Sequence, residues 1–280
     1  MSKTRKIAFI VEGEKSEQRI LENINKHFFS KEKLAPDMTP IILPTGFNIY
    51  TLCKHVNAKE EDEELDIIDL LKEVMHHSVG NYKELQKYRK DEFSEIYLFF
   101  DYDAHHMRNH SVEERERKVE QMLKTFDNET ENGRLFISYP MVESLRDMTY
   151  MNLCNVNFEC CQISLLEGNR YKQIVGDRAE KNDVTSYTQL VWFDILRNYI
   201  LKICCLYNYK YLDYLKYIQD ISPQSIFNKQ QELYILPKKE VITLSGFPEF
   251  LIEYYGQHIW DRIDLNSVAI NKCHHKYNND

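Results

Sequence analysis

IAFIVEG at residues 7–13 and IYLFFDYD at residues 96–103 are the two stretches that decide the fold. Each is a short apolar run that ends in acidic residues, with Glu12 after the first run and Asp101 and Asp103 after the second. Such runs are typical of buried strands in a parallel sheet, because both faces of that sheet are covered. Ligand sites of open α/β sheets lie at the carboxyl ends of strands, so we expect the three carboxylates to share one edge.

These acidic residues predict a site for a divalent cation. Carboxylates brought together repel one another unless a cation or a shared proton offsets their charge, and Mg²⁺ prefers oxygen ligands. Asp101 and Asp103 are two residues apart, so in extended chain both face one side and can hold one or two ions. Gly13 allows a tight turn that leaves the Glu12 carboxylate accessible, although that segment alone is also compatible with an ordinary strand-to-helix turn with solvated acids. Together the residues favour metal-dependent phosphoryl transfer.

Strand-like and helix-like segments alternate around these runs. Apolar periodicity predicts strands and helices in the order 6–11 (strand), 15–29 (helix), 39–43 (strand), 63–77 (helix), 95–100 (strand), 112–126 (helix) and 135–138 (strand). Ser111 is the expected N-cap of the last helix. The order βαβαβαβ predicts an α/β fold with a parallel sheet flanked by helices and right-handed crossovers.

After about residue 146 the alternation stops and helical periodicity dominates. Helices are expected at 190–207, 222–234 and 248–255. We therefore expect a catalytic α/β domain at 1–146 and a mainly helical partner or substrate domain at 147–280. The helical part is rich in tyrosines, which favour core or interface packing, with base stacking as the alternative. These tyrosines are Tyr207, Tyr209, Tyr211, Tyr214 and Tyr217.

The composition is that of a globular protein without a membrane span. At 43% hydrophobic and 29% charged residues, no apolar stretch approaches the ~20 residues that a span requires. The basic start has only five apolar residues before Glu12, which argues against a secretory signal. Seven cysteines without a C-x-x-C spacing favour reduced thiols and a cytoplasmic location. The formal net charge of −8 argues against a general nucleic-acid coat but is compatible with a local site.

The two acidic elements, in this order within an alternating α/β frame, resemble the Toprim domain of topoisomerases, DnaG-type primases, and the OLD-family and RloB-type nucleases. That family carries a Glu after its first strand and an Asp-x-Asp after its third, which Glu12, Asp101 and Asp103 match. The resemblance covers about residues 4–146. It implies that Asp101 and Asp103 bind magnesium and that Glu12 acts as a metal ligand or general acid/base. The long stretch between Glu12 and Asp101 requires an insertion into a compact Toprim core.

EGEKSE at residues 12–17 is similar to the E-G-x-x-[ST]-E opening of small stand-alone Toprim proteins from bacterial antiphage systems. The resemblance implies a Mg²⁺- or Mn²⁺-dependent nuclease that hydrolyses phosphodiester bonds of DNA or RNA and acts as a toxic effector. It also implies a partner ATPase, which we expect to be another chain because the sequence has no Walker A motif. No membrane partner is expected, and self-association stays open.

Other residues lie near the predicted edge. Glu143 follows the last predicted strand, where it is either an additional metal ligand or an ordinary acid in the first turn of a helix. His105 and His106 are candidates to ligate a metal, relay a proton or hold a phosphate, with a solvated pair on a loop as the alternative. Lys15 and Arg19 are candidates for phosphate contacts, with simple surface placement as the alternative.

Two other functional classes are compatible with the same residues. A Toprim-shaped regulatory or scaffold module without turnover would bind a partner protein through the tyrosine-rich half, and the acidic net charge suits it. A phosphatase of the haloacid dehalogenase type also uses Asp-x-Asp after a strand. In that family the motif normally follows the first strand and has a nearby Thr, whereas this pair follows a later strand and continues as Ala104-His105-His106.

Overall fold

The computed structural model describes residues 5–29, 38–59, 65–75, 81–103, 111–149 and 162–265. Contacts between residues divide the chain into two units, each of which is described by itself. The first unit comprises Met1–Tyr102 and Asn109–Ile137, and the second comprises Asp103–Arg108 and Ser138–Asp280. The boundary expected at residue 146 therefore falls inside the second unit.

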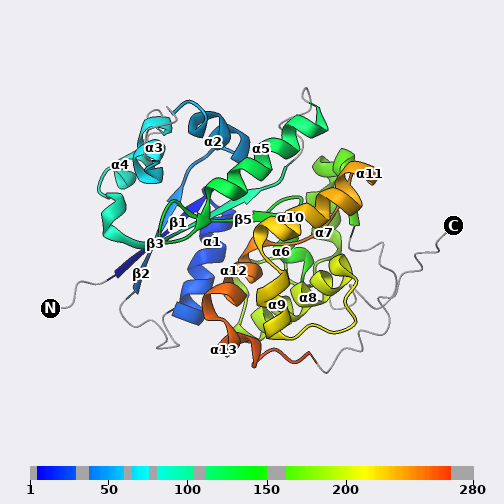
Figure 1. Cartoon of the computed structure of the whole chain (residues 1–280). Coiled ribbons are helices and arrows are strands. Elements are labelled where there is room, and N and C mark those ends of the chain that lie inside the picture. The colour runs from blue at the N-terminus through cyan, green and yellow to red at the C-terminus, as the bar shows by residue number, and fades with distance from the viewer. Residues whose placement is uncertain are drawn as a thin grey trace. The chain divides into compact units, whose positions relative to one another are not determined.

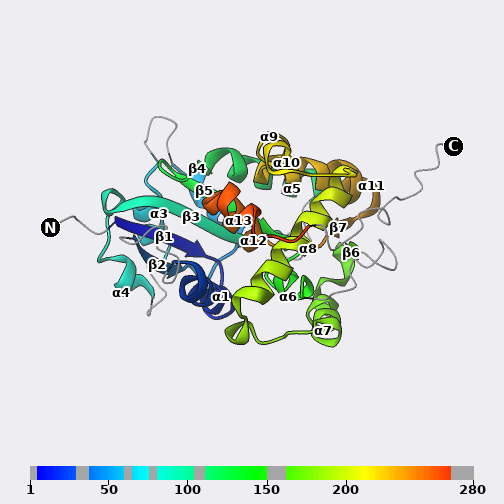
Figure 2. The same ribbon diagram turned by 90° about the horizontal axis from the view of Figure 1, so that it is seen from below.

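A five-stranded sheet in the order β2-β1-β3-β5-β4 is the centre of the first unit (Figure 2). Its strands are β1 (Arg5–Val11), β2 (Met38–Pro44), β3 (Phe93–Asp101), β4 (Asp127–Asn128) and β5 (Gly133–Ser138). β1 pairs in parallel with both β2 and β3, which confirms the predicted α/β class. β4 and β5 form an antiparallel pair that was not predicted, because β4 is only two polar residues long.

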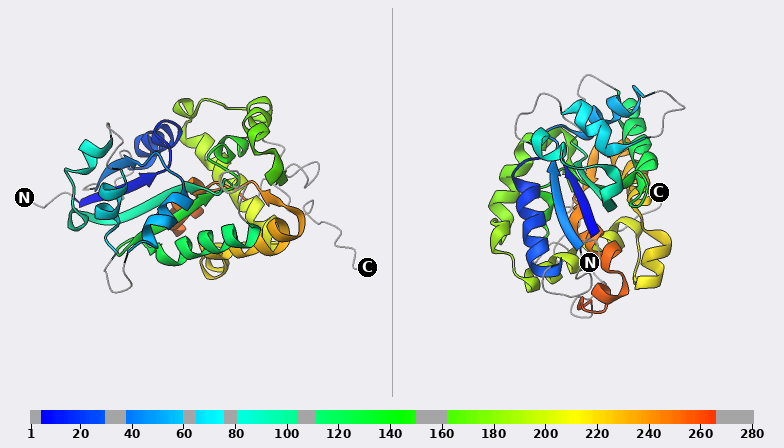
Figure 3. Two further views of the ribbon diagram at one scale, coloured as in Figure 1. Left: turned by 90° about the horizontal axis from the view of Figure 1, so that it is seen from above. Right: turned by 90° about the vertical axis from the view of Figure 1, so that its left-hand side faces the viewer.

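Helices cover both faces of this sheet (Figure 1, Figure 3). α1 (Ser16–Ile24) lies on one face, and α2 (Ile49–Val56) and α5 (Val112–Thr125) lie on the other. Alternate residues of β3 face opposite sides, so the Tyr97 ring stacks on Phe9 while the Phe100 ring stacks on Phe47. The sheet is therefore buried on both sides, as its apolar strands predicted.

The helix ends of the first unit follow ordinary capping chemistry. Ser111 accepts a hydrogen bond from the Glu114 N–H at 3.1 Å, which confirms it as the N-cap of α5. Asn48 caps α2, a helix that was not predicted, by accepting from the Thr51 N–H at 2.9 Å. α1 continues as a π-helical turn to Phe29, and two further helices are α3 (Ile67–Val74) and α4 (Asn81–Leu85).

The second unit is mainly helical, as predicted. The three expected helices are α8 (Gln189–Tyr207), α10 (Pro223–Gln230) and α12 (Gly246–Tyr255). Shorter helices are α6 (Ser144–Asp147), α7 (Gly168–Arg178), α9 (Tyr214–Asp220), α11 (Leu236–Lys238) and α13 (Gln257–Trp260). A small antiparallel sheet of β6 (Gln162–Ser164) and β7 (Glu240–Ile242) was not predicted. Within the described residues, no helix is both long and apolar enough to cross a membrane.

The tyrosine-rich stretch is largely used for packing within the second unit. The Tyr207 hydroxyl lies 2.8 Å from the Ser225 hydroxyl, and the Tyr209 hydroxyl donates to Asp220 at 2.6 Å. The rings of Tyr214 and Tyr217 both pack against Trp260. Tyr211 differs, because 67% of it is exposed. The contacts favour the packing interpretation over base stacking for four of the five residues.

Candidate functional site

Glu12 lies directly beyond the carboxyl end of β1, and backbone hydrogen bonds on both sides hold it. Its N–H donates to the Phe99 carbonyl at 3.2 Å, which extends the β1–β3 pairing by one residue. Its own carbonyl accepts from the Gly46 N–H at 2.9 Å. Gly46 has a φ of 73°, a left-handed conformation that glycine adopts readily. Glu12 is therefore fixed between β3 and the loop that follows β2.

The Glu12 side chain turns toward the end of β3. Its Oε2 atom accepts a hydrogen bond of 3.1 Å from the Asp101 N–H, across 89 residues of sequence. Both residues are partly exposed at the carboxyl edge of the sheet. The structure thus brings Glu12 and Asp101 together, as expected for the ends of adjacent parallel strands.

Glu17, to which the sequence assigned no separate role, closes the turn after Glu12. It is buried, and its Oε1 atom accepts from the Gly13 N–H at 3.0 Å. A Cβ atom at position 13 would lie only 2.6 Å from the Glu17 Oε2 atom. The glycine and the last glutamate of EGEKSE are therefore explained by a tight turn, which leaves Glu12 as the acid at the strand end.

Thr45 is a further residue of this edge that sequence reasoning missed. It is buried, and both its N–H (2.8 Å) and its Oγ1 hydroxyl (3.0 Å) donate to the carbonyl of Val11. These bonds hold the loop after β2 against the end of β1. Its position after the apolar run of β2, before Gly46, was the only sequence signal.

Tyr102, between the two aspartates, is fully buried. Its hydroxyl donates to Glu116 on α5, and its carbonyl accepts from the Tyr50 hydroxyl of α2 at 2.7 Å. Burial, reinforced by the charge of Glu116, raises the pKa of Tyr102 well above its usual value, so the hydroxyl stays protonated. Because adjacent residues of extended chain face opposite sides, Asp101 faces away from the helices that hold Tyr102.

Asp103 and Glu143 belong to the second unit. The Asp103 N–H donates to the Pro140 carbonyl at 3.0 Å. Glu143 directly precedes α6, and its Oε1 atom lies 3.7 Å from Arg146 and 3.5 Å from Lys172. Its Oε2 atom is buried and accepts no hydrogen bond from the part of the chain that the structure describes. The ion pairs of the Glu143 Oε1 atom are those of an ordinary acid at the start of a helix. The Oε2 atom is compatible with the alternative role as a metal ligand.

The other candidate residues are placed only in part. His105 and His106 lie outside the described residues. Lys15 and Arg19 are exposed at the start of α1. In the described ranges, no three His, Cys, Asp or Glu residues form a group that could hold a metal ion by themselves. Mg²⁺ commonly uses one or two carboxylates, completed by water and substrate phosphates, so the chemistry of Glu12 and Asp101 fits this ion.

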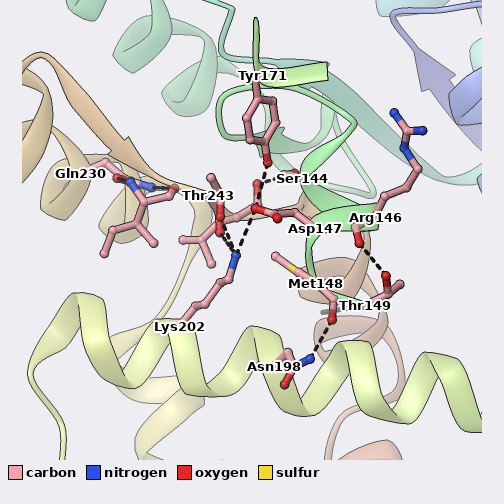
Figure 4. A network of polar contacts seen from close by, with 12 residues as sticks. Ser144, Arg146, Asp147, Met148, Thr149, Tyr171, Asn198, Lys202, Gln230 and Thr243 are labelled. Atoms are coloured by element: carbon pink, nitrogen blue, oxygen red, sulfur yellow. Dashed lines mark hydrogen bonds and ion pairs between the residues drawn. The ribbon is translucent and has the colours of Figure 1, made fainter. Parts of the chain in front are cut away.

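A second buried polar network was missed by sequence reasoning and lies in the second unit (Figure 4). Lys202 on α8 and Asp147 on α6 are both fully buried, with 4.0 Å between the Lys202 Nζ and Asp147 Oδ2 atoms. Lys202 donates to the carbonyl and the hydroxyl of Thr243, and Tyr171 donates to Asp147 at 3.2 Å. A lysine within the apolar run of α8 was the available signal.

A cavity of about 590 Å³ lies elsewhere in the first unit. It is lined mainly by charged residues around the amino end of β3, which begins at Phe93, whereas Asp101 is at the carboxyl end. Its lining consists of Asp66, Asp69, Arg89, Lys90, Asp91, Phe93, Ile96, Glu129, Thr130 and Glu131. The location of the acids, rather than of this cavity, therefore defines the candidate site.

Comparison of the chain with protein-family models, curated proteins and solved structures gave no match.

Proposed function

We propose that the chain is a Mg²⁺- or Mn²⁺-dependent nuclease of the Toprim type, with Glu12 and Asp101 at the centre of its site. The observation that carries the proposal is the hydrogen bond from the Asp101 N–H to the Glu12 carboxylate. It joins two acids from the carboxyl ends of neighbouring parallel strands, where α/β enzymes bind their ligands. Asp103 and Glu143 belong to the second unit, and their roles as further ligands stay predictions from the sequence.

The proposed chemistry follows from the residue types. A bound Mg²⁺ or Mn²⁺ supplies Lewis-acid stabilisation for the negative charge that develops on the phosphate during hydrolysis. Asp101 offers carboxylate oxygens to the cation, and Glu12 is the candidate to hold the proton of the attacking water. The exposed Lys15 and Arg19 are candidates to contact substrate phosphates.

The biological setting that we propose is a toxic effector of a bacterial antiphage system. Its support is the similarity of EGEKSE to the opening of stand-alone Toprim proteins, together with the position of Glu12 at the strand end. In this proposal a separate ATPase restrains or releases the nuclease in the cytoplasm. The mainly helical second unit is the proposed surface for docking that partner or for choosing DNA or RNA.

Cleavage of labelled DNA and RNA pools, with and without Mg²⁺ or Mn²⁺, tests the proposal. Asp101→Ala should abolish cleavage while circular dichroism and thermal unfolding stay as in the wild type. Asp91→Ala is the matched control, because Asp91 is exposed, pairs with Arg89 and lies near the opposite end of β3. Its cleavage should equal that of the wild type.

Cation binding is measured on the same samples by calorimetry, because a restrained effector can be silent in a cleavage assay. Metal-dependent cleavage that persists in Asp101→Ala would remove the proposed site. A folded wild-type protein that binds neither Mg²⁺ nor Mn²⁺, and whose partner binding is unchanged in Glu12 and Asp101 variants, would instead support the scaffold alternative.

A further inference from the structure

The backbone between the two aspartates is anchored from the face of the sheet that carries α2 and α5. The Tyr50 hydroxyl donates to the Tyr102 carbonyl at 2.7 Å, and both residues are buried. That carbonyl belongs to the peptide bond that leads to Asp103. The contact therefore restricts rotation of the peptide group through which the chain passes from one aspartate to the next.

The side chain of Tyr102 provides a second anchor. Its hydroxyl donates to Glu116, a buried residue of α5. The Arg115 Nε atom lies 3.1 Å from the Glu116 carboxylate, and the Arg115 guanidinium is 5.5 Å from the centre of the Tyr102 ring. The arginine offsets the charge of a carboxylate that would be costly to bury alone. The Tyr102 ring, the Glu116 carboxylate and the Arg115 guanidinium therefore pack against one another.

The two helices that supply these anchors are themselves joined. Asn57, just after α2, donates from Nδ2 to the Gln121 Oε1 atom of α5 at 3.2 Å. Tyr50 and Glu116 therefore come from a connected layer, and movement of either helix would be transmitted to the Tyr102 backbone. At the edge of β3 that faces β1, the Asp101 N–H donates to the Glu12 carboxylate.

We propose that Tyr50, Tyr102 and Glu116 are positioning residues that set the carboxylate of Asp101, and the chain leading to Asp103, for cation binding. This inference rests on the proposed function. Tyr102 faces the helix layer and Asp101 faces away from it, so fixing the tyrosine fixes the direction of the acid. Hydrogen bonds that orient ligands without touching the metal typically change metal affinity by 10–100-fold when they are removed.

Tyr50→Phe and Tyr102→Phe test the inference, because each removes a single hydroxyl. Tyr97→Phe is the matched control: it lies on β3, is buried, and donates its hydroxyl to Glu95 at 2.9 Å, near the amino end of the strand. Calorimetric Mn²⁺ titration and the Mn²⁺ dependence of cleavage are the readouts. Both test variants should need roughly ten-fold more Mn²⁺ for half-maximal cleavage and regain near wild-type rates at saturating Mn²⁺. Tyr97→Phe should match the wild type.

Recovery at high Mn²⁺ separates positioning from a general loss of structure, which added metal does not repair. If Tyr102→Phe fails to fold, Tyr50→Phe decides the question, because it removes only the hydroxyl that bonds to the Tyr102 carbonyl. Wild-type Mn²⁺ dependence in the folded variants, with a wild type that binds Mn²⁺ and cleaves, would overturn the positioning role alone. A wild type that neither binds Mn²⁺ nor cleaves would overturn both this role and the proposed function.

Discussion

The two units each contain a buried polar network, and the networks differ in chemistry. In the first unit, the tyrosines Tyr50 and Tyr102 hold the end of β3 through their hydroxyl groups, with the charge pair of Arg115 and Glu116 beside them. In the second unit, the charged side chains of Lys202 and Asp147 are themselves at the centre and are fully buried.

This difference in chemistry indicates that the two networks have different structural roles. The tyrosine network is directly bonded to the backbone that carries the proposed ligands, so it acts on local geometry. The lysine network joins α6, α8 and the residue after β7, and Ser144 adds a 2.9 Å hydrogen bond to the Leu244 carbonyl. A buried charge is costly in any packing that leaves it unpaired, so we expect this network to favour one arrangement of the helical unit.

Removal of the buried lysine should give the largest effect. Lys202→Met takes away the cation that faces Asp147, and leaving a buried charge uncompensated typically costs about 3–5 kcal/mol. We expect the urea midpoint of the second unit to fall accordingly. Hydrogen exchange should show the loss in α6 and α8.

The double variant Lys202→Met, Asp147→Leu sharpens this test. Because it removes both charges, it should recover most of the stability that the single variant loses. A double variant whose loss equals the sum of the two single losses would show that the two side chains do not act as a pair.

Glycine substitutions should have opposite signs in the two units. Gly13→Ala places a Cβ atom against the Glu17 carboxylate, and such overpacking typically costs about 1–3 kcal/mol. A Cβ atom added at Gly176 on α7 would meet nothing within 4 Å beyond its own helix backbone, so Gly176→Ala should stabilise this helix by roughly 0.5–1 kcal/mol. Equal effects of the two variants in thermal unfolding would contradict the proposed role of the tight turn.

Alkaline pH should lower the stability of the second unit more than that of the first. Burial, with a contribution from Glu249, raises the pKa values of Tyr199 and Tyr217 well above normal in the second unit, and burial raises the pKa of Tyr102 in the first. When the folded pKa is raised, the stabilisation is complete below the unfolded value near 10 and is lost as pH rises above it.

At pH 10 each such tyrosine should contribute a loss of well under about 1 kcal/mol. Hydrogen exchange at pH 7 and pH 10, corrected for the intrinsic rate, should therefore show a larger fall in opening free energy for α8 than for β3. Tyr217→Phe should reduce the fall in α8. An equal fall in both elements would contradict the assignment.

Much of the fold could be predicted from periodicity alone. β1 and β3 are long apolar runs with residues buried on both faces, so their pattern is strong. β4, β6 and β7 contain two or three residues each, which is too short to carry a period. The hairpin and the small second sheet depend on tertiary contacts that a local window does not contain.

The candidate site was predictable to the same degree. The meeting of Glu12 and Asp101 follows from two adjacent strand ends, which sequence order and apolar pattern indicate. The support around Tyr102 does not follow, because Tyr50 lies 52 residues away and Glu116 lies in a charged run that is typical of an exposed helix face. Burial of these residues is set by packing between α2, α5 and β3.

Mn²⁺ titration of the wild type and Glu12→Gln is the most direct test of the central claim, which is that the acids at the ends of β1 and β3 form a cation site. Glu14→Gln is the matched control, because Glu14 is exposed two residues away. We predict saturable Mn²⁺ binding by the wild type. Glu12→Gln should lower the Mn²⁺ affinity by roughly ten-fold or more, and Glu14→Gln should leave it unchanged. Equal Mn²⁺ affinity in the wild type and Glu12→Gln would contradict the claim.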